Sequence, residues 1–386
     1  MKILHLCLGC FYIDNYSYQE NMLPKFHKQM GYDVEIIAST VSFNSSGKGC
    51  HVEAGSYENE YGIHVTRLPY FKFLGNKIGK FLRIYNGTYE AIKGANPDII
   101  FVHGCQFLDM KYVVKYAKKH KVTIYVDNHA DFSNSATNWL SKNILHGLVW
   151  RHCAQIIEPY TDKFYGVLPV RVDFLKNVYH IPEQKCELLV MGADDDLVEK
   201  ANADSVKSTI RNQLGIKDND FLIITGGKID QWKTQTFLLM EAVKRIQMQN
   251  VKLVVFGSVV DELKEKMNNL VDGEKIQYIG WITSTDSYKY FAASDLVVFP
   301  GRHSVMWEQV AAQGIPMIVK QWEGTTHIDL KGNVLFLKED SVDEIEKTLI
   351  KVLTDDNQYL SMRKCAREKG MEFFSYKNIA ARSIKE

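Results

Sequence analysis

Two adjacent glycines followed by two lysines mark a segment with the chemistry of an anion site. Gly226 and Gly227 come directly after an apolar run, Lys228 follows them, and Lys233 precedes a segment with helical spacing. Glycines let a backbone approach a ligand closely, a helix N-terminus offers unpaired N–H groups, and two lysines can neutralise a diphosphate. The spacing differs from that of the phosphate loop G-x-x-x-x-G-K-[ST], which argues against a triphosphatase. The pattern favours a phosphate-binding site over the alternative that Lys228 and Lys233 are ordinary surface lysines.

A second polar segment follows the apolar run 296–299. His303 and Ser304 open it, Glu308 comes four residues after Ser304, and Gly314 ends the helix that we predict to begin near Ser304. Ligands of open α/β sheets bind at the carboxyl ends of parallel strands, and one helical turn would place Ser304 and Glu308 on one face. The segment is a second candidate for ligand contact, although a glutamate in this position also fits a solvated helix.

Polar residues also follow three apolar runs in the first half of the chain. Gly9 follows the first run, His103 ends another, and His129 follows a third between Asp127 and Asp131. The two carboxylates can orient His129, and Asp131 can instead cap the helix after it. His103 can be either a hydrogen-bonded structural residue or a residue that contacts a ligand, and the structural role is favoured.

Strands and helices that position these residues alternate along the chain. Apolar runs without polar alternation predict strands buried on both faces, and segments with apolar residues every three or four positions predict helices between them. This alternation is typical of α/β folds with parallel sheets and helices on both faces, so we expect two Rossmann-like domains. The pattern restarts after the polar stretch 192–220, which puts the domain boundary near residue 190. The predicted strands are 2–8, 34–38, 99–102, 122–126, 221–225, 252–256, 296–299, 316–319 and 334–337.

Composition excludes several classes of protein. Of 386 residues, 46% are hydrophobic and 24% are charged, which excludes fibrous and disordered chains. A net charge of +1 argues against a nucleic-acid partner. The cysteines are odd in number and scattered, as in a reducing compartment. No run is long enough for a membrane-spanning helix and the first run is too short for a secretory signal, so we expect a cytoplasmic protein.

Charge is distributed unevenly along the chain. Residues 1–190 carry a formal charge of +4 and residues 191–386 carry −3. The segment 71–85 interleaves four cations with aromatic and aliphatic residues. Such a segment can lie on an anionic membrane surface, which would make the protein peripheral at the inner membrane face. The alternative is a helix that packs on its own domain and keeps its cations in solvent.

The order of these motifs resembles the donor domain of family-four retaining glycosyltransferases, which have the two-domain GT-B fold. The resemblance extends into the first half of the chain, where His129 is similar to a histidine that follows a strand of the acceptor domain. Gly192-Ala-Asp194 resembles the segment that enters the second domain. The motifs that carry the resemblance are the glycine–lysine segment, Phe256-Gly257, Gly280-Trp281-Ile282, Ala293-Ser294-Asp295, and Glu308 ahead of Gly314-Ile-Pro316.

The resemblance implies a role for each matching residue. Lys228 and Lys233 would contact the donor diphosphate beside Gly226 and Gly227, and Glu308 would receive the ribose hydroxyls. His129 would face the transferred sugar, and the backbone near Trp281 and Ile282 would recognise the base. The family usually has a Glu-x7-Glu pair, but Pro300 stands where the first glutamate belongs. His303 or Ser304 would then take over part of its role, while Gly9, His103 and Asp127 are weaker candidates for the acceptor side.

The resemblance also implies a domain plan and an activity. Residues 1–190 would bind the acceptor, 191–365 the nucleotide sugar, and 366–386 would form a helix that crosses back to the first domain, with the active cleft between the domains. The expected activity is retaining transfer of a sugar from a UDP- or GDP-sugar to a saccharide or lipid-linked acceptor in polysaccharide biosynthesis, without a cofactor or a metal. A nucleotide-sugar epimerase of the same fold and a non-catalytic nucleotide- or sugar-binding protein are the alternatives.

Overall fold

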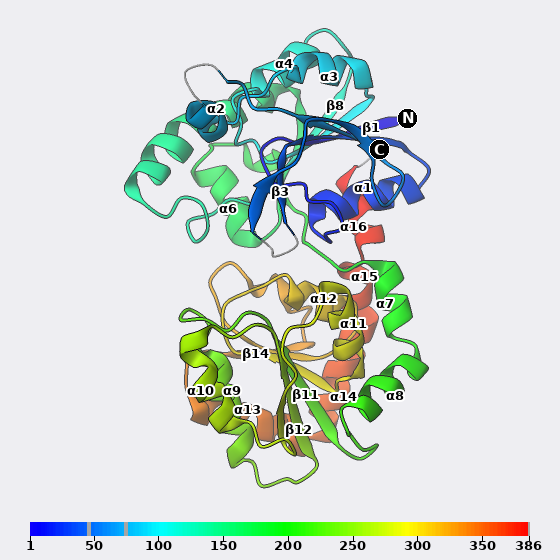
Figure 1. Ribbon diagram of the computed structural model, residues 1–386, viewed down its shortest axis with the longest axis vertical. Helices are drawn as coiled ribbons and strands as arrows, with labels where there is room; N and C mark the ends of the chain where they lie inside the picture. Colours follow the sequence, from blue (N-terminus) through cyan, green and yellow to red (C-terminus); the bar gives the residue numbers. More distant parts are fainter. Residues whose placement is uncertain (45–47, 73–75, 385–386) are drawn as a thin grey trace. The chain divides into compact units, whose positions relative to one another are not determined.

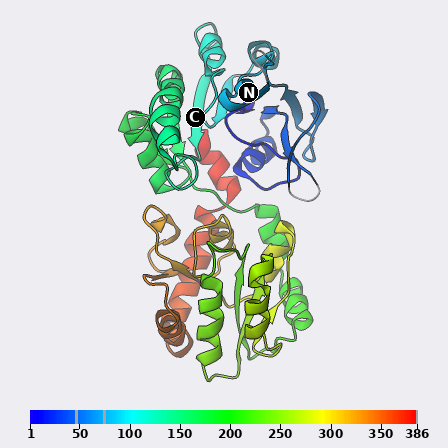
Figure 2. The same cartoon turned by 60° about the vertical axis from the view of Figure 1, so that its left-hand side comes forward.

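Two compact units make up the chain. The computed structural model describes residues 1–44, 48–72 and 76–384, apart from the side chains of 76–78. One unit comprises Met1–Val190 together with Ile379–Glu386, and the other comprises Met191–Asn378. Each unit is a sheet with helices on both faces (Figures 1 and 2).

The sheet of the first unit has the strand order β10-β9-β8-β7-β1-β2-β6-β5 in the described part of the chain. All neighbours pair in parallel except β5 and β6. β1 and β7 are almost entirely buried because apolar residues cover both faces of these central strands. The strands are β1 Lys2–Cys7, β2 Asp33–Ser39, β5 Gly55–Glu58, β6 His64–Leu68, β7 Ile99–His103, β8 Thr123–Asn128, β9 Thr161–Gly166 and β10 Cys186–Leu188, with a separate hairpin of β3 Val41–Phe43 and β4 Gly49–His51.

Helices connect these strands and close the core of the first unit. Phe101 and Tyr165 stack within the sheet, and Trp150, Cys153 and Phe174 bring helices onto it. The helical segments are α1 Gln19–Gln29, α2 Asn76–Leu82, α3 Thr88–Ala95, α4 Met110–Ala117, η1 Ser141–Trp150, α5 Arg151–Ile157, η2 Glu158–Tyr160, α6 Pro169–Asn177 and η3 Glu183–Lys185.

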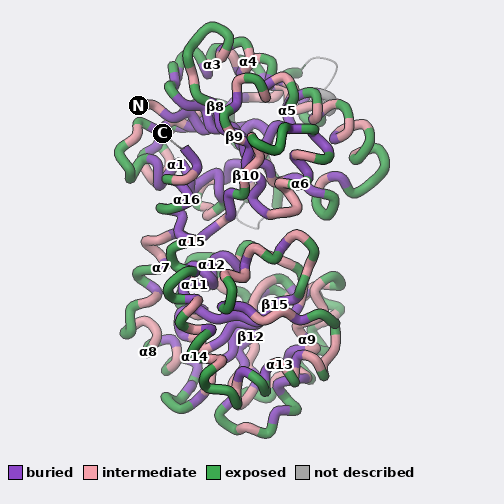
Figure 3. The backbone as a smooth tube through the Cα atoms, turned by 180° about the vertical axis from the view of Figure 1, so that it is seen from behind, coloured by how far each residue is buried: buried purple, intermediate pink, exposed green. Residues whose placement is uncertain are grey.

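The sheet of the second unit is parallel in the order β13-β12-β11-β14-β15-β16. Helices α9 and α13 cover one face, and α8 and α11 pack together on the other (Figure 1). Figure 3 shows both sheets as buried tubes between helices with exposed outer sides. The strands are β11 Phe221–Gly226, β12 Val251–Phe256, β13 Ile276–Tyr278, β14 Leu296–Phe299, β15 Met317–Lys320 and β16 Val334–Leu337.

Local sequence signals set the helices of the second unit. Ser341 Oγ accepts the N–H of Glu344 at 3.1 Å and caps α13, and Gly314 has a φ of +72° just after α12 ends. The helical segments are α7 Asp195–Ala201, α8 Asp204–Gln213, α9 Gln235–Arg245, η4 Asp261–Leu263, α10 Lys264–Leu270, α11 Ser284–Ala293, α12 Met306–Ala312, η5 Thr326–Ile328, α13 Val342–Thr354, α14 Asp356–Cys365, η6 Ala366–Gly370, α15 Met371–Phe373 and α16 Tyr376–Ser383.

The C-terminal division differs from the one expected at residue 365. Residues up to Asn378 group with the second unit, and only Ile379–Glu386 group with the first. Gly370 packs on the backbone of α12 so closely that a Cβ there would lie 2.4 Å from the carbonyl oxygen of Ala311. Ala193 also pairs with Ser375 as a parallel bridge. These backbone contacts hold 366–378 in the second unit.

The basic segment 71–85 is partly engaged by its own unit. The Lys80 ammonium lies 3.0 Å from Nε2 of His51, and the Arg83 guanidinium donates to the carbonyl oxygens of Gly9 and Gln106. The segment includes residues 73–75, which lie outside the described residues. Phe71 and Phe81 are exposed. Throughout the described ranges, no helix has both the length and the apolar character needed to cross a membrane.

Candidate functional site

Glycines at the ends of β11 and β12 let two loops of the second unit touch. Gly257 has a φ of +122°, and a Cβ on it would lie 1.9 Å from the carbonyl oxygen of Gly227. A Cβ on Gly226 would lie 2.2 Å from the ring of Phe256. Gly226 therefore has a packing reason to be glycine, whereas Gly227 has a φ of +126°, which favours glycine without any packing constraint.

Replacing Gly257 with alanine is expected to destabilise the fold by more than about 2 kcal/mol, because it combines a strained φ with a backbone clash. Gly94→Ala is the matched control. Gly94 lies in α3, and a Cβ there meets nothing within 4 Å, so this change should raise stability by up to about 1 kcal/mol. Thermal and denaturant unfolding would measure both, and equal stability of the two variants would contradict the packing argument.

The two lysines of the anion segment lie between β11 and α9. Lys228 is exposed and its ammonium lies 3.3 Å from Oδ2 of Asp230, and Lys233 is half-buried. Burial raises the pKa of Asp230. The N–H of Trp232 and the Lys228 ammonium lower it by more, so the pKa lies below its ordinary value. The Thr234 side chain, at the N-cap position of α9, makes no capping hydrogen bond. Both cations therefore lie at the carboxyl end of β11 ahead of a helix N-terminus, an arrangement that suits an anion.

Glu308 is a buried carboxylate held by two imidazoles. Its side chain has no exposed surface, and its Oε1 accepts hydrogen bonds from Nε2 of His303 and Nε2 of His327, each at 2.8 Å. Burial raises the pKa of Glu308, but the two histidines lower it more, so the pKa lies well below its ordinary value. Among the described residues, Oε2 is buried without a hydrogen-bond partner. An ionised acceptor with one free oxygen is suited to receive hydroxyl groups.

These three side chains also offer three ligand atoms within 4.8 Å of one another, as a metal site would. Both imidazoles, however, point their Nε2 at the same carboxylate oxygen. Nδ1 of His327 is buried without a partner in the described part of the chain, whereas a metal-bound histidine almost always donates its other ring N–H to a second group. The donor set fits a hydrogen-bonded carboxylate better than a metal centre.

His303 and Ser304 lie before the helix that carries Glu308. The helix predicted to begin near Ser304 begins two residues later, at Met306, and the Ser304 carbonyl accepts the N–H of Trp307 at 3.0 Å. Ser304 therefore shares no helix face with Glu308, whereas His303 contacts Glu308 directly. The sequence does not point to His327, because this residue lies in the short turn η5, where no periodic pattern marks a side chain.

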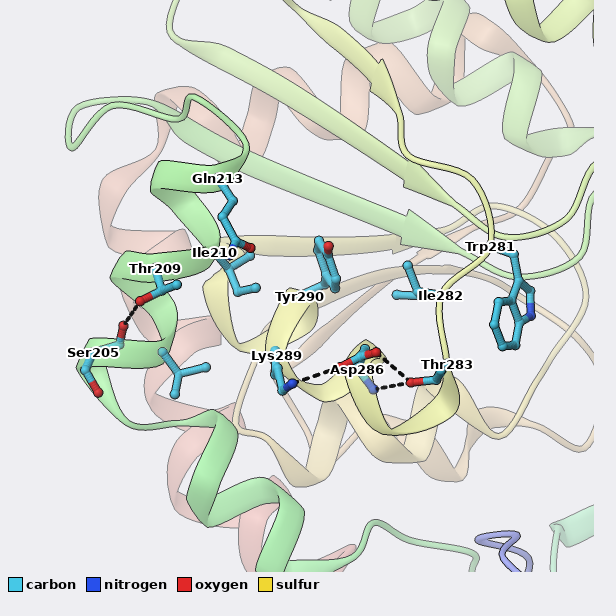
Figure 4. Close-up of a pocket in the computed structure, with 11 residues that line it drawn as sticks. Ser205, Thr209, Ile210, Gln213, Trp281, Ile282, Thr283, Asp286, Lys289 and Tyr290 are labelled. Atoms are coloured by element: carbon cyan, nitrogen blue, oxygen red, sulfur yellow. Dashed lines mark hydrogen bonds and ion pairs between the residues drawn. The ribbon is translucent and has the colours of Figure 1, made fainter.

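Trp281 and Ile282 follow β13 and line a pocket of about 580 Å³ between α8 and α11 (Figure 4). The Trp281 side chain is 70% exposed, and Ile282 is half-buried. Thr283 Oγ1 caps α11 by accepting the N–H of Asp286 at 3.0 Å. The loop is thus anchored at the helix start and presents an accessible indole beside a pocket.

In the first unit, His129 lies next to a buried carboxylate. Nε2 of His129 lies 3.5 Å from Oδ2 of Asp127 and 3.9 Å from Oε1 of Glu20, and its side chain is 28% exposed. Burial lowers the pKa of His129, but Asp127 and then Glu20 raise it more, so that the pKa lies above its ordinary value. The arrangement can place a cationic, partly exposed imidazole at the carboxyl end of β8.

Three weaker candidates for the acceptor side are buried. His103 and Asp127 have no exposed side-chain surface, and Nδ1 of His103 lies 2.8 Å from Oδ2 of Asp127. A Cβ on Gly9 would lie 2.2 Å from the carbonyl oxygen of Gly104. Both ring nitrogens of His103 bond to protein groups, as in the structural role that the sequence favours for this residue. Gly9 and Asp127 likewise serve the packing and hydrogen bonding of the unit.

Comparisons with known proteins agree with this architecture. Residues 206–369 match the family model of glycosyl transferases group 1. An uncharacterized glycosyltransferase of Methanocaldococcus jannaschii is 22% identical over 214 residues, which cover 54% of this chain and 55% of that protein. Mannosylfructose-phosphate synthase of Agrobacterium fabrum is 21% identical over 248 residues, covering 60% and 52%. The matched region spans about half the length of these curated relatives.

Solved structures match over nearly the whole chain. HepE of Anabaena in complex with UDP has a TM-score of 0.67 at 15% identity, covering 99% of this chain and 98% of that one. The UDP-GlcNAc 2-epimerase of Neisseria meningitidis bound to UDP-GlcNAc has a TM-score of 0.65 at 13% identity, covering 98% and 97%. The two α/β units have the GT-B fold of these neighbours. The segment 206–369, which carries Lys228, Lys233 and Glu308, is the part that matches the group 1 glycosyltransferases.

Proposed function

We propose that this protein is a nucleotide-sugar-dependent glycosyltransferase. The observation that supports this most directly is the Glu308 carboxylate, which two imidazoles hold ionised with Oε2 buried and unpartnered. The family match covers this residue. In the proposed function, Oε2 receives the ribose hydroxyls of a UDP- or GDP-sugar. His303 and His327 compensate for the glutamate that Pro300 replaces by holding Glu308 in place.

The remaining residues of the second unit would serve the departing diphosphate and the base. Sugar transfer builds negative charge on the leaving phosphate, and cations aimed at that charge stabilise the transition state electrostatically. Lys228, Lys233 and the N-terminus of α9 would fill this role without a metal. The backbone at Trp281 and Ile282 would contact the base.

The first unit would bind the acceptor, with His129 facing the transferred sugar. The acceptor is a saccharide or a lipid-linked saccharide of a polysaccharide pathway, and transfer proceeds with retention of configuration. The exposed Phe71 and Phe81 support contact of the segment 71–85 with an anionic membrane surface.

An epimerase is the second candidate because a UDP-GlcNAc 2-epimerase shares the fold with a TM-score of 0.65. A non-catalytic binding protein is the third, because the first glutamate of the usual pair is missing. An epimerase converts a nucleotide sugar without an acceptor, whereas a transferase needs one and a binding protein converts nothing.

A donor screen tests the proposal. We expect one class of nucleotide sugar among UDP-, GDP-, ADP- and CMP-sugars to raise the unfolding temperature, because a ligand that binds only the folded state stabilises it. Release of the nucleoside diphosphate should then depend on an added saccharide acceptor. Conversion of the donor alone into an epimer would select the second candidate, and no stabilisation by any nucleotide sugar would overturn the proposal.

A further inference from the structure

Three buried imidazoles form a continuous hydrogen-bonded chain inside the first unit. Nε2 of His103 in β7 lies 2.9 Å from Nδ1 of His5 in β1, and Nε2 of His5 lies 3.0 Å from Nδ1 of His27 in α1. All three side chains have no exposed surface. The chain therefore crosses from the middle of the sheet to the helix on its face without meeting solvent.

Both ends of this chain meet oxygen atoms that accept hydrogen bonds. At one end, Nδ1 of His103 lies 2.8 Å from Oδ2 of Asp127. At the other end, Nε2 of His27 lies 3.1 Å from the carbonyl oxygen of Ala380 and 3.1 Å from Oγ of Ser383, both in α16. The Ser383 hydroxyl lies 2.8 Å from the same carbonyl oxygen and donates to it. The carboxylate and the carbonyl can only accept.

This arrangement determines the number of protons in the chain. Each of the four links, from Asp127 to His103, His5, His27 and the Ala380 carbonyl, needs one proton, and neither end supplies one. Three neutral imidazoles carry only three N–H groups. A fourth proton is therefore required, and one of the three imidazoles must be a cation. The ionised Asp127 supplies the balancing negative charge.

The electrostatics place this cation on His103. Burial lowers the pKa of His103, but Asp127 raises it more, to about 9. Burial, the largest cause in each case, lowers the pKa of His5 well below its ordinary value and that of His27 to about 4. Four other groups, from four parts of the unit, affect the pKa values of His103, Asp127 or His129 at this end of the chain. They are Cys7, Glu20, His129 and Arg171.

We propose that the chain of His103, His5 and His27 holds one extra proton, on His103, and that the three histidines act as positioning residues that keep Asp127 ionised beside His129. Ala380 and Ser383 form the far end of the chain. The link to sugar transfer rests on the proposed function, in which His129 faces the transferred sugar. Asp127 orients His129, and the imidazole chain fixes the charge and the position of Asp127.

Nitrogen NMR of the full chain with labelled histidine tests the proton count directly. At pH 7.5 we expect one imidazolium, assigned to His103 with a His103→Gln variant, and two neutral imidazoles at His5 and His27. Ser383→Ala should leave His103 cationic, because the Ala380 carbonyl still accepts from His27. Three neutral imidazoles in the unaltered protein would overturn the proposal, because the fourth proton would then come from the Ser383 hydroxyl or from a protonated Asp127.

A matched pair of variants at His27 tests the far end of the chain. Glutamine offers one acceptor and one donor, as His27 does, whereas leucine offers neither. We expect His27→Leu to weaken proton binding at His103 at least tenfold and His27→Gln to restore most of it. Equal titration of His103 in both folded variants would contradict a proton held by the chain. If His27→Leu does not fold, the spectra of the unaltered protein and of Ser383→Ala still decide the question.

The role of the imidazole chain in sugar transfer has a separate test. Because the nucleotide would bind in the second unit, His27→Leu should lower kcat at least tenfold and leave the affinity for the nucleotide unchanged, with rescue by His27→Gln. Unchanged kcat in a variant that has lost the His103 cation would refute the positioning role. Absence of transfer in the unaltered protein would instead refute the proposed function, and the proton count would stand.

Discussion

Replacing Glu308 with glutamine is expected to weaken nucleotide binding by about 10- to 100-fold, which corresponds to the loss of hydrogen bonds to a charged group worth about 1.5–3 kcal/mol. Glutamine has the size of glutamate, but its amide has only one oxygen. If that oxygen keeps the bonds from His303 and His327, an NH₂ group replaces Oε2. The position that would accept ribose hydroxyls then becomes a donor.

Titration calorimetry with the nucleoside diphosphate identified by the donor screen would measure this loss. Glu265→Gln is the matched control, because Glu265 is an exposed residue of α10. Unfolding experiments on both variants would show whether the fold is retained, since Glu308 is a buried carboxylate with two hydrogen-bonded partners. Full nucleotide affinity in a folded Glu308→Gln protein would remove the main support for the proposed function.

Replacing Lys233 with alanine is expected to lower sugar transfer by about 100- to 1,000-fold, the range typical of removing one electrostatic contact to a developing charge. Lys233 is half-buried and lies in the loop between the carboxyl end of β11 and the start of α9. The fold should persist because the side chain belongs to a surface loop. The effect should appear mainly in kcat, since negative charge on the leaving phosphate grows in the transition state.

Steady-state kinetics with the selected donor would measure the effect. Lys244→Ala removes an exposed lysine from the last turn of the same helix and should leave the rate unchanged. A rate for Lys233→Ala equal to that of the control would exclude the contact with the diphosphate and leave Lys228 as the remaining candidate.

Much of the fold could be predicted from the sequence because the central strands are buried on both faces. Such strands appear as continuous apolar runs, and the nine predicted runs correspond to strands whose ends differ by at most about two residues, the usual uncertainty of element boundaries. The strands β3, β4, β5, β6, β9, β10 and β13 were missed, because strands of mixed polarity or of only three residues carry no such signal. β9 contains Thr161, Asp162 and Lys163, and β13 has only three residues.

The residues of the candidate site also differ in how far the sequence could predict them. Lys228, Lys233 and Glu308 could be found because each lies near the end of an apolar run, where a parallel sheet brings loops to one edge. His303 was correctly expected to lie near Glu308. Its hydrogen bond to Glu308, and the second hydrogen bond from His327, were not predictable. His327 is 19 residues away from Glu308 and lies in a turn without periodicity.

The α/β class, the central strands and the segments that carry cations and a carboxylate follow from the sequence alone, because they depend on local apolar patterns and spacing. Which polar groups come into contact depends instead on the packing of distant segments. Packing of β1, α1 and β7 joins His5, His27 and His103, and His27 contacts Ser383, which is 356 positions away in the sequence. Hydrogen bonds in a buried network depend on positions in space, and no local pattern encodes them.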